Sequence, residues 1–174
     1  MSENIKNIST LHNLLDYDVS KFTSAEVHLK QRLPEWINIA GSLKLKTLLQ
    51  KYQDLVETHI LKLEEFTEEE KINSLSVTNR IMQAFLEEAN EKMTACTDTE
   101  IKDACLLASI QAINHFKIST YGTAAAFANL LDMEKQAAFF HEAEVSEKQI
   151  DDRLSQLAEH EINIKARTPI ALPG

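Results

Sequence analysis

Residues that form turns are scarce in this chain of 174 residues, which contains only three glycines and three prolines. Average proteins use about 7% glycine and about 5% proline. Because hairpins and tight turns depend on these residues, the shortage argues against a sheet with many hairpins. Alanine, leucine, glutamate, glutamine and lysine are abundant instead. All five are good helix formers, so the composition indicates a nearly all-helical protein.

Cysteine is also rare, since Cys96 and Cys105 are the two in the chain and form no Cys-x-x-Cys pair. Cysteine-based metal sites and disulfide frameworks need close pairs or several cysteines. We therefore interpret both as reduced thiols, which is typical of a cytoplasmic protein.

Several sequence signals of particular partners are missing. The N-terminus has no basic segment leading into an apolar core, so we expect no signal peptide. No apolar run approaches the ~20 residues that a membrane span needs. The net charge of −9 argues against nucleic acid, because phosphate binding needs clustered lysine and arginine. Glycine-rich phosphate loops and a Ser/His/Asp order are absent too, which leaves hydrolase and nucleotide-binding functions without support.

Apolar residues recur every three to four positions in several stretches, as in amphipathic helices. The four long stretches cover about 11–40, 43–66, 100–130 and 133–166. A shorter one, about 77–94, lies between the second and third. This order predicts an all-α fold: a ferritin-like up-down four-helix bundle with a short extra helix in the crossover between helices two and three.

The length fits a single domain, which we place at residues 10–166. Residues 1–9 are predicted to form an N-terminal arm. Residues 167–174, with two prolines and a glycine, are predicted to form a loose tail. Pro34 predicts a kink or a break in the first helix just before it, because proline lacks the backbone N–H.

Each long apolar stripe carries a polar residue near its middle. These residues are Glu26, His59, the pair Asn114 and Lys117, and Glu147. Burying an unpaired carboxylate or amine is costly, so helices that pack together usually exclude such groups. Carboxylates and a histidine facing inward at mid-height are how dimetal bundles build their sites. The third helix, however, offers an amide and an ammonium.

Residues 103–123, DACLLASIQAINHFKISTYGT, carry a family resemblance. The segment resembles the third helix of the YciE/YciF-like ferritin-like family of bacterial stress-associated proteins, whose members typically read DAALIAAAQxVEHYEIAxYGT. Other stretches resemble the family as well: Ala25-Glu26, Leu33-Pro34, residues 85–89, and Glu147-Lys148 with Asp151. The resemblance spans roughly residues 10–165. It implies a ferritin-like fold and a role in stress, but no particular reaction.

The sequence departs from the family pattern at the metal positions. Where the family's third helix reads E-H-Y-E, this chain has Asn114 and Lys117 around a retained His115. In the fourth helix Glu147 is kept, but its neighbour is Ser146. Dimetal sites of this fold usually use Glu-x-x-His, because residues three apart share a helix face. None of the six histidines has a glutamate three residues before it, so we expect no ordinary di-iron site.

The second predicted helix can be aligned with the family pattern in two ways. One alignment places the family's carboxylate and its partner at Asp54 and Glu57, and another places them at Leu55 and His59. Asp54 and Glu57 share a polar, solvated-looking face, and His59 could equally be a hydrogen-bonded core histidine. We interpret the acidic run over residues 64–70 as a solvated helix end.

Lys117 is the most informative departure, because an ammonium group can balance the charge that a metal ion balances elsewhere. We hypothesise that Glu26, Lys117 and Glu147 meet in the bundle centre, with Asn114 and His59 completing a buried polar cluster. In the competing interpretation, Lys117 extends to solvent from the edge of its helix.

Two functions follow from these observations. The first is a stress-associated protein with a degenerate dimetal site, no catalysis and no cofactor. We expect it to form a homodimer through leftover apolar residues such as Ile118, Phe127 and Phe139. The alternative is a metalloprotein with weak oxidase or peroxide-related activity. Its candidate ligands for one Fe, Mn or Zn ion are Glu26, His59, Glu147 and Asp151.

Overall fold

The computed structural model describes residues 7–72 and 78–167, and these residues form helices without any strand. The elements are α1 (Leu11–Ile39), α2 (Leu43–Glu69), α3 (Arg80–Ala95), α4 (Thr99–Leu130) and α5 (Glu134–Leu157), then a π-helical turn (Ala158–Ile162) and α6 (Asn163–Arg167). The all-α prediction is confirmed. The predicted arm at 1–9 and tail at 167–174 lie almost entirely outside the described residues.

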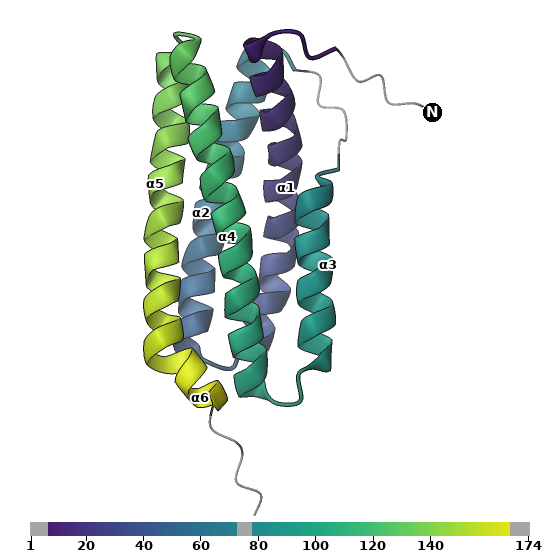
Figure 1. Ribbon diagram of the computed structural model, residues 1–174, viewed down its shortest axis with the longest axis vertical. Helices are drawn as coiled ribbons and strands as arrows, with labels where there is room; N and C mark the ends of the chain where they lie inside the picture. Colours follow the sequence, from purple (N-terminus) through teal and green to yellow (C-terminus); the bar gives the residue numbers. More distant parts are fainter. Residues whose placement is uncertain (1–6, 73–77, 168–174) are drawn as a thin grey trace, which may run out of the picture.

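The four long helices α1, α2, α4 and α5 run side by side (Figure 1). The short helix α3 comes between α2 and α4 in sequence and packs against α1 and α4. Each long helix turns an apolar face to the others, and the middle of these faces is where the polar residues lie. None of the described helices combines the length and the apolar character needed to cross a membrane.

Of the two alternatives predicted at Pro34, a kink or a break, the break does not occur, because helix α1 continues to Ile39. Pro34 lies on the exposed side of the helix, where the carbonyl group of Lys30 can be solvated after losing its N–H partner. The neighbouring Leu33 and Trp36 are fully buried and hold the flanking turns in the core.

The predicted fourth helix differs from the observed one in the opposite way, because it is interrupted where a continuous helix was predicted. Helix α5 ends at Leu157, and the chain continues through a π-helical turn into α6. Ala158 and Ile162 of this turn are buried, so the wider turn keeps apolar side chains against the core.

The turn between α1 and α2 is attached to α4 by one buried carboxylate. Asp103 accepts hydrogen bonds from the backbone N–H groups of Gly41 and Ser42, both at 2.8 Å. The turn approaches α4 so closely that a Cβ atom on Gly41 would lie 2.1 Å from Thr99 Cγ2. Ser42 caps α2 by accepting a hydrogen bond from the N–H of Leu45.

Candidate functional site

The Lys117 side chain of α4 lies at the centre of the molecule with no exposed surface. Its Nζ atom is 2.9 Å from Glu26 Oε1 of α1 and 2.5 Å from Glu147 Oε1 of α5. Both glutamates are also fully buried. A buried ammonium is tolerated when carboxylates pair with it, so these three residues form one ionic unit.

Tyr52 of α2 adds a contact from the one long helix that the three charged residues do not include. Its hydroxyl group donates to Glu147 Oε2 at 2.8 Å and accepts from Lys117 Nζ at 3.1 Å. The Lys117 ammonium also lies 4.5 Å from the centre of the Tyr52 ring, within cation–π range. Tyr52 was not among the site residues predicted from the sequence. The sequence feature that could have identified it is its hydroxyl group, because Tyr52 lies seven residues before His59 on the same helix face.

Glu147 is the most heavily bonded member of the cluster. Asn114 donates its amide to Glu147 Oε2 at 2.7 Å and to the Glu147 backbone carbonyl at 3.0 Å. His59 Nδ1 lies 3.5 Å from Glu147 Oε1. Glu26, in contrast, has Lys117 as its one polar contact among the described residues.

The unequal bonding separates the pKa values of the two carboxylates. Burial raises the pKa of Glu26 to about 7, although the Lys117 charge opposes this change. Burial acts on Glu147 too, but Lys117 and the His59 contact outweigh it and lower the pKa of Glu147. Burial alone would lower the pKa of Lys117, and the two glutamates raise it instead. Near neutral pH, Lys117 and Glu147 are therefore an ion pair, and Glu26 gains or loses the proton.

His59 and Tyr121 form the edge of the cluster. Burial lowers the pKa of His59, which keeps the imidazole neutral at physiological pH. Its ring packs edge-on against Tyr121, with centroids 5.1 Å apart. The Tyr121 hydroxyl group is buried without a hydrogen-bond partner among the described residues.

The remaining candidate acids lie away from the cluster. Asp151 faces outward and contacts His115 Nε2 at 2.9 Å. Asp54 is exposed, and Glu57 reaches Lys30 on the surface at 3.8 Å. In helix two it is therefore His59, rather than Asp54 and Glu57, that faces the centre.

A family described as "Domain of unknown function (DUF892)" matches residues 10–167. The chain belongs to this family. Protein YciF from Escherichia coli K12 is 29% identical over 163 residues, which cover 92% of this chain and 97% of YciF. The YciE/YciF-like resemblance predicted from the sequence is confirmed.

Two solved structures share the fold of this chain. The crystal structure of the E. coli stress protein YciF has a TM-score of 0.84 at 27% identity, covering 90% of this chain and 99% of that one. YcfI from Rhodopseudomonas palustris, a proposed structural protein, has a TM-score of 0.82 at 24% identity and covers 88% and 98%. The second likeness concerns the fold alone.

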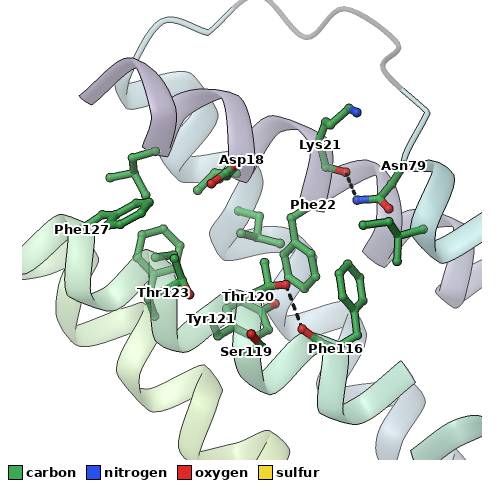
Figure 2. A pocket seen from close by; sticks show the side chains of 16 residues that line it. Asp18, Lys21, Phe22, Asn79, Phe116, Ser119, Thr120, Tyr121, Thr123 and Phe127 are labelled. Atoms are coloured by element: carbon green, nitrogen blue, oxygen red, sulfur yellow. Dashed lines mark hydrogen bonds between the residues drawn. The ribbon is translucent and has the colours of Figure 1, made fainter. Parts of the chain in front are cut away.

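This DUF892 chain also has a cavity of about 250 Å³ between α1 and α4 (Figure 2). Its walls are mainly apolar and include Phe22, Phe127 and the Tyr121 ring. Two of its polar groups are already engaged, since Thr120 donates to the Phe116 carbonyl and Asn79 donates to the Lys21 carbonyl. Binding pockets usually present a few converging polar groups. The cavity therefore offers weaker evidence of a site than the Lys117 cluster does.

Proposed function

We propose that this chain is a ferritin-like four-helix-bundle protein in which a salt-bridged lysine replaces the dimetal centre, and that it is not an enzyme. The observation that carries the proposal is the position of Lys117 Nζ between Glu26 and Glu147. A fixed positive charge already balances the carboxylates there. A second cation at the same point would be repelled.

The composition of the cluster supports this proposal. Dimetal carboxylate bundles draw one glutamate from each of two helices and a Glu-x-x-His pair from each of the other two. Here two glutamates and a tyrosine contact the ammonium, and a neutral histidine and an amide contact Glu147 beside it. The buried groups form a hydrogen-bonded ionic core, which joins α1, α2, α4 and α5 and can fix their register.

We further propose a role in the stress response, because the related YciF is described as a stress protein. The predicted homodimer belongs to the same proposal. Phe127 and Phe139 pack partly against the core and leave part of each ring for an interface, and Ile118 is half-buried. Light scattering coupled to size-exclusion chromatography would measure the mass in solution. A monomer at micromolar concentration would contradict the dimer.

A second candidate function is a single Fe, Mn or Zn ion held by Glu26, His59 and Glu147. The convergence of these three side chains near one point favours it. It requires Lys117 to move aside or lose its proton, and the raised pKa of Lys117 opposes that loss. Asp151, the fourth candidate ligand, faces His115 and would have to reorient.

Metal analysis of protein purified without chelator tests the two functions. If the proposed function is correct, the Lys117→Glu variant gains bound iron or manganese and the Lys117→Met variant gains none. The Glu26→Ala variant then has the same metal content as the wild-type protein. Stoichiometric metal in the wild-type protein that disappears in Glu26→Ala would overturn the proposal and establish the metalloprotein. The Glu26→Ala comparison is needed because metal bound elsewhere on the chain would survive this substitution.

A further inference from the structure

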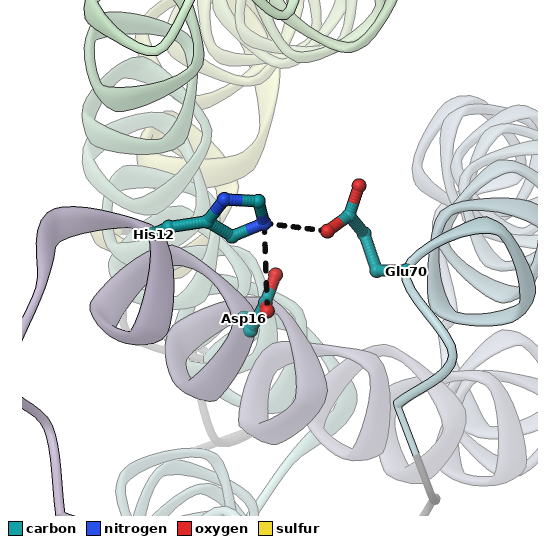
Figure 3. Close-up of side chains that lie close together, drawn as sticks. All are labelled: His12, Asp16 and Glu70. Atoms are coloured by element: carbon teal, nitrogen blue, oxygen red, sulfur yellow. Dashed lines mark hydrogen bonds and ion pairs between the residues drawn. The ribbon is translucent and has the colours of Figure 1, made fainter.

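A second group of potential ligands lies at the end of the molecule where α1 begins and α2 ends (Figure 3). His12 is in the first turn of α1, Asp16 follows one turn later, and Glu70 caps the C-terminus of α2. His12 Nε2 is 2.6 Å from Glu70 Oε2 and 3.7 Å from Asp16 Oδ2. One ligand atom from each residue falls within 4.8 Å of the other two.

The 3.7 Å between His12 and Asp16 is close to the spacing of two ligands on one metal ion, whereas the 2.6 Å between His12 and Glu70 is a direct hydrogen bond that an ion would have to replace. Zinc bonds of about 2.1 Å in tetrahedral geometry place two ligand atoms about 3.4 Å apart. His12 and Asp16 are four residues apart and share a helix face, so both can ligate one ion. Glu70 approaches from the other helix. Small side-chain rotations would bring all three ligands to metal-binding distance.

The local charge also favours a cation. Two carboxylates face a single imidazole nitrogen, and Asp16 Oδ1 is buried without a hydrogen-bond partner among the described residues. The neighbouring Glu65 and Glu69 differ, because Lys135 pairs with both.

The other described histidines provide a contrast. His115 contacts one carboxylate, Asp151, and His141 contacts one, Glu144. Within residues 7–72 and 78–167, His12 is the one histidine whose ring lies against carboxylates from two helices. The arrangement therefore differs from ordinary surface pairing.

We propose that His12, Asp16 and Glu70 form a binding site for a divalent transition-metal ion of the zinc class. One imidazole and two carboxylates suit Zn²⁺, Co²⁺ and Ni²⁺. The His12 side chain is 47% exposed, so the ion can enter from solvent and keep water at its open positions. The acidic run over residues 64–70, interpreted from the sequence as a solvated helix end, then has a function at its last residue.

A metal at this position would connect the start of α1 to the end of α2. Ligands that bind the folded state alone stabilise it, so the ion should raise the melting temperature. This site does not depend on the Lys117 cluster. It can be present whether or not the central carboxylates bind metal.

The test uses the full-length, tag-free chain after chelator treatment and dialysis. Calorimetric titration with Zn²⁺ should show one equivalent bound, and Co²⁺ should give a visible absorption band of protein-bound metal. His12→Ala and Glu70→Gln should each weaken Zn²⁺ binding at least tenfold and abolish the rise in melting temperature. His115→Ala is the matched control and should bind Zn²⁺ within twofold of wild type.

Other outcomes overturn the proposal. They are the absence of saturable binding, binding that His12→Ala and Glu70→Gln leave unchanged, and binding lost in His115→Ala. Binding lost in Glu26→Ala but retained in His12→Ala would place the ion at the central carboxylates. That result would overturn this site and the proposed function at once, whereas loss in His12→Ala alone supports this site and leaves the proposed function intact.

Discussion

Tyr52 and Tyr121 are both fully buried beside the Lys117 cluster, but their hydroxyl groups are in opposite situations. The Tyr52 hydroxyl bonds to Glu147 and Lys117, whereas the Tyr121 hydroxyl has no partner among the described residues. Removing one partner of a buried hydrogen bond costs about 1–3 kcal/mol, because the remaining group is left unsatisfied. We expect Tyr52→Phe to lower the unfolding free energy by that amount. Tyr121→Phe should stay within about 0.5 kcal/mol of wild type or stabilise the protein.

Denaturant unfolding of the two variants is a matched comparison, because each loses one oxygen atom at a buried ring. Equal destabilisation by both substitutions would contradict the hydrogen-bond assignment.

Glu26 should make stability depend on pH. Its pKa is raised from 4.5 to about 7 in the folded state, so between these values the folded chain holds a proton that the unfolded chain has released. Raising the pH across this window therefore lowers the unfolding free energy. Linkage gives about 2–3 kcal/mol for this group between pH 5 and pH 8. In the Glu26→Gln variant this loss of unfolding free energy should disappear. The stability of the variant relative to wild type should therefore increase as the pH rises.

Chemical denaturation at pH 5 and pH 8 measures this difference. The lowered pKa of His59 acts in the opposite direction, since stability from that group rises with pH through its own window. His59 is present in both proteins, so its contribution largely cancels. Parallel pH profiles for wild type and Glu26→Gln would show that the Glu26 pKa is not raised.

Among the elements, the turn between α1 and α2 depends most on a single side chain. Asp103 of α4 accepts the N–H groups of Gly41 and Ser42, which attaches one helix pair to the other. Hydrogen bonds to charged groups contribute about 1.5–3 kcal/mol each. We expect Asp103→Ala to cost about 2–4 kcal/mol, and Asp103→Asn, which keeps one acceptor oxygen, to cost less.

Asp98 offers a control on the same helix, because it caps the N-terminus of α4 by accepting from the N–H of Ile101. Asp98→Ala should cost about 1 kcal/mol, as the loss of a cap usually does. Denaturant unfolding of both alanine variants checks the order. A smaller effect at Asp103 than at Asp98 would mean that the turn is held by other contacts.

The existence of the helices followed from local sequence patterns, but their continuity did not. Apolar spacing and the scarcity of glycine and proline are properties of short segments, and they indicated each long helix with ends close to those observed, except at the C-terminal end of α5. Pro34 and the turn at Ala158–Ile162 depend on which side of the helix is solvated and which is packed. Those properties are set by the neighbouring helices.

Across the whole molecule, the sequence could predict those features of the site that depend on one helix, but not those that depend on the packing of several helices. Lys117 on an apolar stripe, opposite glutamates on other stripes, was visible as a charge that needed partners. The role of Tyr52 could not be predicted, because a tyrosine on an apolar stripe packs well whether or not its hydroxyl group makes a hydrogen bond. Asp151 lies one turn beyond Glu147 on α5 but contacts His115 of α4, and this contact between two helices could not be predicted from the spacing along α5. His12 and Glu70 are 58 residues apart and meet through the packing of α1 against α2.

Because Lys117 joins α1, α2 and α5 to α4, its charge should stabilise the whole bundle rather than one helix. Lys117→Met keeps most of the side-chain length but leaves two buried carboxylates facing each other. Breaking a buried ion pair in this way costs about 3–5 kcal/mol. We expect Lys117→Met to lose about that much unfolding free energy at pH 8, and less at pH 5, where Glu26 is protonated.

The triple variant Glu26→Gln, Lys117→Met, Glu147→Gln removes all three charges at similar volume. Replacing a whole buried ion cluster is often neutral, so it should recover most of the stability that Lys117→Met loses. Denaturant unfolding at both pH values, followed by circular dichroism, measures each step. If Lys117→Met unfolds like wild type at pH 8, the ammonium does not hold the helices together. The bundle would then owe its arrangement to apolar packing alone.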